Sequence, residues 1–382
     1  MEDHKFWKTQ PIINTKTTKV DEDGIIQIID VEGTPKEPYK LPDGYEWHTL
    51  DLNDETDLNN ITKFLLENYL EDSEVNLQFN YSKESIKWFA QRPNHFPELF
   101  ICIRVTATKK IAATIFGIPS NLKINQNNVK LIEINLLCVN KKLRSKRLAV
   151  VMIKEVSRRV IFRGVWHAVY TAVAELPNTL SNVTYYHRFI NIRKLMDIDF
   201  INRKNNTLSI MERLHKIKEP EVKMRLLQKE DIPQCVEKLN KKLNNFKLTH
   251  VFDNESFEHY FMPRENVIYT YVVEKDGLVI TDLISFFIVD NKVVNNPKHT
   301  SYRACYLYYY FNESTSLETL MNSCLYYAQK SDVDVFNILN MFELDTIVKD
   351  CKFVRGSGSL NYYLYNYKCN TMKSNEIGLP VF

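Results

Sequence analysis

The segment 131–149 has the residues best suited to chemistry, because an apolar strand there runs into a basic turn and then into a helix. Arg144, Lys146 and Arg147 cluster at the expected start of that helix. The first N–H groups of a helix have no partner within it and lie at the positive end of its dipole. These features favour binding of a pyrophosphate without a glycine-rich loop. The positive charge alone is explained at least as well by an ordinary basic turn that is exposed to solvent and binds no ligand.

The composition is that of an ordinary globular protein. Of the 382 residues, 44% are hydrophobic and 25% are charged, and a chain of this length can bury a large core. A formal net charge of +3 argues against a protein organised around nucleic acid. Neither GxGxxG nor GxxxxGK[ST] occurs, which disfavours nucleotide sites built on glycine-rich loops.

The cysteines form no CxxC pair, which argues against zinc ribbons and thioredoxin-like motifs. Their odd number and irregular spacing in a long chain predict reduced cysteines in the cytoplasm. The amino terminus lacks the apolar stretch of a signal peptide, and no apolar run is long enough to span a membrane. The cysteines are Cys102, Cys138, Cys235, Cys305, Cys324, Cys351 and Cys369.

Hydrophobic periodicity and turn signals predict a repeated order of elements. Prolines and weak periodicity predict an extended arm over residues 1–45, and Asp276-Gly277 is a strong hairpin signal. In the first half we expect helices over 58–69 and 148–160, and strands over 98–107, 110–118, 129–139 and 168–174. In the second half we expect strands over 267–273, 278–288, 303–311, 333–339 and 360–367, and helices over 316–331 and near 345–352.

Hairpin, strand, helix and strand therefore recur at an offset of roughly 170 residues. This order predicts an α/β (α+β) fold of two pseudo-symmetric halves. We expect the arm over 1–45, an N-terminal half over 46–215 and a C-terminal half over 216–382, divided at a charged linker around Pro220. The pattern leaves open whether the halves share one merged core or fold as two domains.

The chain resembles a known protein family through several motifs. These motifs follow one another in the same order as in the family and extend over nearly the whole chain. The segment 131–149, LIEINLLCVNKKLRSKRLA, resembles the acyl-CoA site of the eukaryotic glycylpeptide N-tetradecanoyltransferase (N-myristoyltransferase) family. The resemblance implies a divergent member with two acetyltransferase-like (acyl-CoA N-acyltransferase) halves and a merged, saddle-like sheet. The other matching motifs are HKFWKTQP at 4–11, ENYLED at 67–72, FNY at 79–81, AVYTA at 168–172, YYHR at 185–188, RKL at 193–195, LNYYLYN at 360–366 and GL at 378–379.

The resemblance implies transfer of a tetradecanoyl group from its CoA thioester to the amine of an N-terminal glycine. Direct attack by the amine creates an oxyanion that needs preorganised donors. The resemblance assigns these to the backbone N–H groups of Leu136 and Leu137, which a bulge would release from ladder pairing. The family usually has an aromatic residue at the Leu136 position, and backbone donors tolerate that difference.

The attacking amine must be neutral, although a free α-amino group has a pKa of about 8. In the family the base is the carboxylate of the last residue, which here is Phe382 where members commonly end in Leu or Gln. An exposed carboxylate is a weak base, so the site must desolvate it. The spacing from Gly378-Leu379 is kept, whereas Pro380 is a departure that stiffens the tail. By itself, a chain end is more often frayed.

The resemblance also implies contacts with acyl-CoA and with a peptide whose basic residues would suit acidic side chains near Asp72. His187 and Ser285 are candidates for polar contacts with a Ser or Thr of that peptide. The implied acyl-CoA residues are His4, Lys5, Phe6, Trp7, Leu136, Leu137, Cys138, Val139, Arg144, Ser145, Lys146, Arg147, Leu148 and Ala149. The implied peptide residues are Tyr69, Leu70, Glu71, Asp72, Phe79, Tyr81, Asn135, Thr171, Tyr185, His187, Ser285, Tyr309 and Leu360.

Two departures leave an alternative function open. Val173 stands where the family has a glycine near the peptide channel, and Ser357 replaces an aspartate between two glycines. They motivate the alternative of a catalytically weak or inactive binder of acyl-CoA or of myristoylated peptide. A short-chain acetyltransferase is disfavoured because the RxxGxG-type phosphate loop is absent.

The expected co-substrate is myristoyl-CoA, with no permanently bound cofactor and no metal. The expected partners are peptides and nascent proteins with an N-terminal glycine. We expect a cytoplasmic monomer without a transmembrane segment or a nucleic-acid partner.

Overall fold

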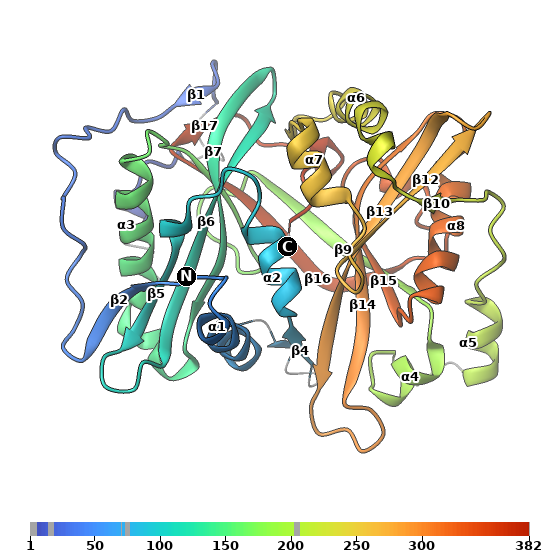
Figure 1. Cartoon of the computed structure of the whole chain (residues 1–382), viewed down its shortest axis with the longest axis horizontal. Coiled ribbons are helices and arrows are strands. Elements are labelled where there is room, and N and C mark those ends of the chain that lie inside the picture. Colours follow the sequence, from blue (N-terminus) through green and yellow to red (C-terminus); the bar gives the residue numbers. More distant parts are fainter. Residues whose placement is uncertain (1–5, 14–18, 70, 73–76, 202–206, 382) are drawn as a thin grey trace.

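The structure is a computed structural model that describes residues 6–13, 19–69, 71–72, 77–201 and 207–381. Within these residues, one large sheet of 16 strands runs through the whole molecule (Figure 1), and a small two-stranded sheet attaches the arm. No helix of this part of the chain is both long and apolar enough to cross a membrane. No group of three His, Cys, Asp or Glu side chains among the described residues is arranged to hold a metal ion.

The elements have the following bounds. The strands of the first half are β1 (Gly24–Ile25), β2 (Tyr45–Thr49), β3 (Glu71–Asp72), β4 (Leu77–Asn80), β5 (Phe100–Val105), β6 (Ile111–Ile124), β7 (Asn127–Val139), β8 (Ala168–Ala172) and β9 (Ser181–Phe189). Those of the second half are β10 (Arg225–Leu226), β11 (Leu248–His250), β12 (Ile268–Lys275), β13 (Val279–Val293), β14 (Ser301–Asn312), β15 (Val335–Leu339), β16 (Val354–Tyr365), β17 (Tyr367–Lys368) and β18 (Ile377–Gly378). The α-helices are α1 (Glu55–Asn68), α2 (Lys83–Ala90), α3 (Leu148–Ile161), α4 (Ile192–Asp197), α5 (Leu208–Leu214), α6 (Ile232–Leu243), α7 (Asn254–Phe261) and α8 (Leu317–Lys330). The short 3₁₀ helices are η1 (Trp7–Thr9), η2 (Pro97–Leu99), η3 (Lys141–Lys146), η5 (Lys229–Asp231), η6 (Leu344–Thr346) and η7 (Ser374–Glu376).

The predicted repeat is confirmed. In the first half, the antiparallel strands β5, β6 and β7 lead into α3, and β8 returns parallel to β7. In the second half, the antiparallel strands β12, β13 and β14 lead into α8, and β15 returns parallel to β14. Helix α8 begins roughly 170 residues after α3. In Figure 1 these two helices lie at opposite sides of the molecule.

The two halves exchange strands and share one core. Strand β16 lies between β8 and β9 of the first half, and β9 in turn pairs with β15. Strand β11 pairs with β6, and β4 pairs with β13. The largest cluster of buried hydrophobic side chains contains residues from Leu50 to Leu379. The two halves therefore share one merged core. The division of the chain near residue 216 stays a prediction.

Three details differ from the sequence expectations. The expected helix near 345–352 is reduced to η6 and a single turn in which the N–H of Cys351 donates to the carbonyl of Ile347, and Lys352, with a φ of 58°, ends this stretch. The arm is not simply extended, since β1 pairs with β17. Strands β1–β4, β9–β11 and β18 and the helices α2 and α4–α7 were not predicted, although α6 buries residues at the helical spacing of Ile232, Cys235 and Leu239.

Candidate active site

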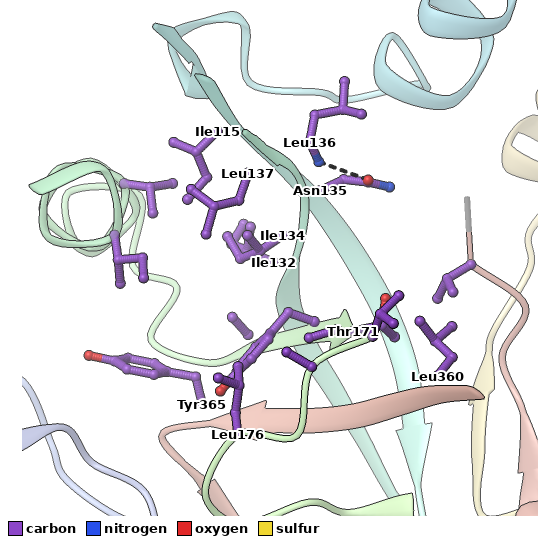
Figure 2. Close-up of a pocket in the computed structure, with 18 of the residues that line it drawn as sticks. Ile115, Ile132, Ile134, Asn135, Leu136, Leu137, Thr171, Leu176, Leu360 and Tyr365 are labelled. Carbon is purple, nitrogen blue, oxygen red and sulfur yellow. Dashed lines mark hydrogen bonds between the residues drawn. The ribbon is translucent and has the colours of Figure 1, made fainter. Parts of the chain in front are cut away.

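A cavity of about 450 Å³ lies between the two halves, and its walls are largely apolar. Strand β7 supplies Ile132, Ile134, Asn135, Leu136 and Leu137, and the facing strand β8 supplies the stretch Ala168–Ala172 except Val169. Figure 2 shows that Ile115 and Leu137 lie on one side of the view and Thr171 and Leu360 on the other. The lining is thus mainly apolar beside Ile115 and Leu137, and it includes the polar side chains of Asn135 and Thr171 elsewhere.

Helix α3 forms the wall of the apolar end. Its residues Ile153, Val156, Ser157, Val160 and Ile161 line the cavity, and their spacing places them on one face of the helix. This periodicity was the reason to expect an amphipathic helix, and the structure adds that part of its apolar face is left uncovered by other side chains.

Strand β7 contains the expected bulge at Leu136. Thr114 of β6 pairs with Cys138, and Phe116 pairs with Asn135, so two residues of β7 oppose one residue of β6. Leu136 has a φ of 48°, a conformation that is unfavourable for a residue with a side chain. The bulge also lies beyond Ile134, the last residue of β7 that pairs with β8. The backbone at Leu136 and Leu137 is thereby removed from the regular ladder on both sides.

The peptide groups around Leu136 are held by side chains. The N–H of Leu136 donates to Oδ1 of Asn135 at 2.8 Å, which Figure 2 draws as a dashed line. The carbonyl of Leu136 accepts from Oγ1 of Thr114, also at 2.8 Å. Thr114 is completely buried, and no sequence signal had singled it out.

The carboxyl end of the chain reaches the polar end of this cavity. Leu379 is fully buried, and its carbonyl accepts from the hydroxyl of Tyr362 at 2.6 Å. Val381 lines the cavity. Phe382 lies outside the described residues, so its carboxylate position stays a prediction.

The basic turn at the start of α3 remains exposed. Arg144, Ser145, Lys146 and Arg147 are all accessible at the surface. Arg144 donates to the carbonyl of Asn68 at 2.8 Å, which fixes this turn against the end of α1. Arg147 has a φ of 57° and begins α3 without a side-chain cap, so the N–H groups of the first turn are not covered by such a cap. Leu148 is buried and Ala149 is half-buried.

The arm packs across the same region. Trp7 lines the cavity and stacks on Tyr170 with ring centroids 5.8 Å apart, and Tyr170 stacks on Tyr363 at 5.0 Å. Phe6 contacts the edge of Trp7. Trp7 is therefore docked on β8, its contact with acyl-CoA stays a prediction, and His4 and Lys5 lie outside the described residues.

Most of the expected peptide residues that are described line the cavity, but three do not. Leu70 lies outside the described residues, and only the backbone of Glu71 and Asp72 is described. The residues on the cavity wall are Tyr69, Phe79, Tyr81, Asn135, Thr171, Tyr185 and Leu360. His187, Ser285 and Tyr309 are not among the lining residues.

His187 lies beneath a glycine-rich bulge. Its Nδ1 is 2.7 Å from Oδ1 of Asn337, and burial lowers the pKa of His187 although this hydrogen bond raises it. A Cβ added to Gly356 would come within 2.3 Å of Nε2 of His187. The glycine is therefore required by packing, which explains Gly356 better than a contact with substrate.

Ser285 and Tyr309 form a second bulge that corresponds to the first. Ile284 pairs with Tyr310 and Phe286 pairs with Leu307, so two residues of β14 oppose Ser285. The hydroxyl of Ser285 accepts from the N–H of Tyr309 and lies 3.1 Å from its carbonyl as well. This second bulge is thus closed by its own serine.

A buried polar network behind the cavity was missed in the sequence. Glu133 of β7 accepts from Nη1 of Arg92 at 3.3 Å and lies 2.7 Å from Nε2 of His250. Nδ1 of His250 is 2.6 Å from the hydroxyl of Tyr309, and Arg92 donates to Tyr260 at 3.1 Å. These residues are far apart in the sequence, and a single glutamate within an apolar strand was the only signal.

The charge of Glu133 contributes to stability. Burial disfavours the carboxylate, but His250 and Arg92 outweigh burial and lower the pKa of Glu133 from 4.5 to about 2. Because the pKa is lowered by folding, this stability is present above about pH 4.5 and is lost as the pH falls towards 2.

We expect Glu133→Gln to lower the free energy of unfolding by about 3 kcal/mol at pH 7, because it leaves Arg92 buried without its counter-charge. The melting temperature, followed by circular dichroism, measures this loss. Glu212→Gln, which alters the exposed pair with Arg193, is the control and should cost less than about 1 kcal/mol. The difference between E133Q and wild type should narrow as the pH drops below 4.5. A constant difference down to pH 3 would contradict this explanation.

Comparisons with known proteins agree on one family. The model of the myristoyl-CoA:protein N-myristoyltransferase N-terminal domain matches residues 25–183, and that of the C-terminal domain matches residues 197–379. A glycylpeptide N-tetradecanoyltransferase of Plasmodium falciparum is 38% identical over 99% of this chain and 93% of its own length. Glycylpeptide N-tetradecanoyltransferase 1 of Arabidopsis thaliana is 38% identical over 98% of this chain and 88% of its own. A crystal structure of Saccharomyces cerevisiae N-myristoyltransferase with bound myristoyl-CoA covers all of both chains, with a TM-score of 0.95 and 33% identity.

Proposed function

Because the chain belongs to the myristoyl-CoA:protein N-myristoyltransferase family and is an acyltransferase, we propose that it transfers the tetradecanoyl group of myristoyl-CoA to the amine of an N-terminal glycine. One observation carries this proposal. The irregular backbone at Leu136 and Leu137 lines a mainly apolar cavity that Asn135, Thr171 and Val381 of the carboxyl-terminal segment also line.

The apolar end of the cavity suits the acyl chain. Its wall consists of the cavity-lining face of α3 together with Ile132, Ile134 and Ala168. Each methylene transferred from water to such surroundings contributes about 0.8 kcal/mol. Myristoyl-CoA is therefore bound as a co-substrate largely through its chain, and the polar thioester lies where the wall becomes polar.

In the proposed reaction, the neutral glycine amine attacks the thioester carbonyl carbon. A C–N bond forms, the carbonyl oxygen becomes an oxyanion, and collapse of this intermediate expels the CoA thiolate. The N–H groups of Leu136 and Leu137 stabilise the oxyanion. Since Leu136 donates to Asn135 in the structure, its N–H must exchange partners, which leaves Oδ1 of Asn135 available to accept from the amine.

The proton of the amine is taken by the terminal carboxylate of Phe382. The course of the preceding residues supports this role, because Leu379 is anchored by Tyr362 and Val381 lines the cavity. Burial of a carboxylate raises its pKa towards that of the amine and so improves it as a base. In this arrangement the glycine amine of the peptide and the thioester of the acyl-CoA meet at the centre of the molecule.

The CoA phosphates are assigned to the basic turn before α3. Arg144, Lys146 and Arg147 supply positive charge there, and the first turn of α3 supplies backbone N–H groups. The arm residues Phe6 and Trp7 close over the neighbouring part of the cavity. Tyr69, Phe79, Tyr81, Tyr185 and Leu360 are left to line the path of the peptide.

The proposal is tested by CoA release from myristoyl-CoA in the presence of a peptide that begins with glycine, with mass spectrometry of the product. We expect saturable transfer to this peptide and none to the same peptide beginning with proline, whose amine is secondary and sterically hindered. Tight binding of myristoyl-CoA without release of CoA would instead support the non-catalytic binder. Val173 lines the cavity with a side chain that is 59% exposed, so this departure lies on the peptide path. Cytoplasmic location and the monomeric state stay predictions.

A further inference from the structure

The hydroxyl of Thr114 affects the reacting region only indirectly, through its hydrogen bond to the backbone of β7. Thr114 lies on β6, is completely buried and donates to the carbonyl of Leu136 at 2.8 Å. Its backbone pairs with Cys138, next to the bulge. The hydroxyl therefore bonds to a carbonyl that the bulge has displaced from regular pairing.

The direction of this carbonyl determines the direction of an N–H group. The carbonyl of Leu136 and the N–H of Leu137 belong to one planar trans peptide unit, in which they point in opposite directions. The carbonyl of Leu136 points at the hydroxyl of Thr114, so the N–H of Leu137 points away from that hydroxyl. Strands β7 and β8 stop pairing after Ile134, and Leu137 lines the cavity at this place.

The backbone conformation of Leu136 needs a restraint such as the hydrogen bond from Thr114. Leu136 has a φ of 48°, which is unfavourable for leucine and persists only where surrounding groups impose it. Without the hydroxyl, the displaced carbonyl would be a buried acceptor lacking this donor, and the peptide unit would gain by rotating. Rotation would turn the N–H of Leu137 away from the thioester.

The second bulge shows what a different placement of the hydroxyl does. Ser285 occupies the position that corresponds to Ile115, one residue along from the position of Thr114. There the hydroxyl accepts from the N–H of Tyr309 and donates to the carbonyl of the same residue, so that amide is satisfied within the core. In the first bulge the hydroxyl of Thr114 donates to the carbonyl of Leu136, the residue before Leu137, so it does not occupy the N–H of Leu137.

We propose that Thr114 is a positioning residue for acyl transfer, which holds the Leu136–Leu137 peptide unit so that its N–H faces the thioester oxygen. This inference rests on the proposed function. It adds a residue that does not touch the substrate and acts through the oxyanion donors.

The test compares Thr114→Val, which keeps the shape and removes the hydroxyl, with Thr114→Ser, which keeps the hydroxyl. Steady-state rates are measured with myristoyl-CoA and a peptide that begins with glycine. We expect kcat of T114V to fall at least about tenfold. The loss should be smaller than the 10²- to 10³-fold loss that is typical when an oxyanion donor itself is deleted. The KM values for both substrates should stay within about twofold, because the interaction strengthens only in the transition state. T114S should recover kcat to within about twofold of wild type.

Thr270→Val is the matched control for loss of a buried threonine hydroxyl. Thr270 lies on β12, is completely buried, and its Oγ1 has no hydrogen-bond partner among the described residues. It is remote from the bulge in β7, so T270V should keep the kcat of wild type. Equal losses in T270V and T114V would show a general effect of packing and overturn the inference.

The inference is also overturned if T114V is folded and keeps the kcat of wild type, or if only its KM values change. Those outcomes leave the proposed function intact because wild type remains active. If wild type itself transfers nothing, the proposed function fails and this inference fails with it. Should T114V not give folded protein by circular dichroism, Thr114→Ala replaces it against T114S, with the same expected loss of kcat and the same overturning result.

Discussion

Extending the chain by one glycine after Phe382 is expected to lower kcat about 100-fold or more. The added residue moves the terminal carboxylate by the length of a residue, and a general base contributes about 10²- to 10⁴-fold to a rate. The preceding segment cannot shift to compensate, because Leu379 is buried and anchored by Tyr362. Single-turnover transfer from pre-bound myristoyl-CoA measures the chemical step directly.

Two controls separate the carboxylate from the side chain and from general disturbance. Phe382→Leu keeps the carboxylate in place and should keep kcat within about threefold, since the base lies on the backbone. A glycine added at the amino terminus should leave the rate unchanged. Undiminished turnover in the extended chain would eliminate the terminal carboxylate as the base, and a polar group near Asn135 or Thr171 would have to be considered instead.

Ser157→Phe is expected to reduce transfer from myristoyl-CoA by roughly 100-fold or more and to make a shorter acyl-CoA the better substrate. Ser157 lies on the cavity face of α3, beside Val156 and Val160. The phenyl ring would take the space of about four to five methylenes, each worth about 0.8 kcal/mol when buried. The comparison of kcat/KM for myristoyl-CoA and decanoyl-CoA measures the change in preference.

Ser157→Ala is the matched control, since it removes the hydroxyl without filling the cavity. It should preserve the preference for myristoyl-CoA, and its effect on kcat/KM should stay within about threefold. If S157F discriminated between the two acyl chains as wild type does, the chain would have to lie elsewhere and the assignment of the apolar end would be wrong. A loss of activity with every acyl-CoA would instead indicate misfolding, which the melting temperature reveals.

Several features of the site follow from local sequence. The amphipathic stretch that became α3 and the basic turn before it were readable because hydrophobic periodicity and charge clustering are local features of the sequence. The repeated order of elements was also readable, and it correctly indicated two similar halves. The resemblance of the motifs then identified the family, which the comparisons confirm.

Other features arise from contacts between distant segments. Glu133, Arg92 and His250 form their network only because β7, the end of α2 and β11 meet behind the cavity. The position of His250 in the sequence does not reveal its partner, since a buried charge is tolerated wherever the fold brings a counter-charge. For the same reason Ser285 and Tyr309 were expected at the peptide but pack in the core.

By itself, the sequence determined the family and the two α/β halves, and it singled out the segment proposed to bind the acyl-CoA. The tertiary structure decided how these halves merge and where the bulge at Leu136 lies relative to the cavity. The physical reason is range: side-chain patterns report which surfaces are apolar, whereas the direction of a peptide unit depends on a partner strand. At Leu136 that partner is Thr114, whose hydroxyl holds the carbonyl from the neighbouring strand.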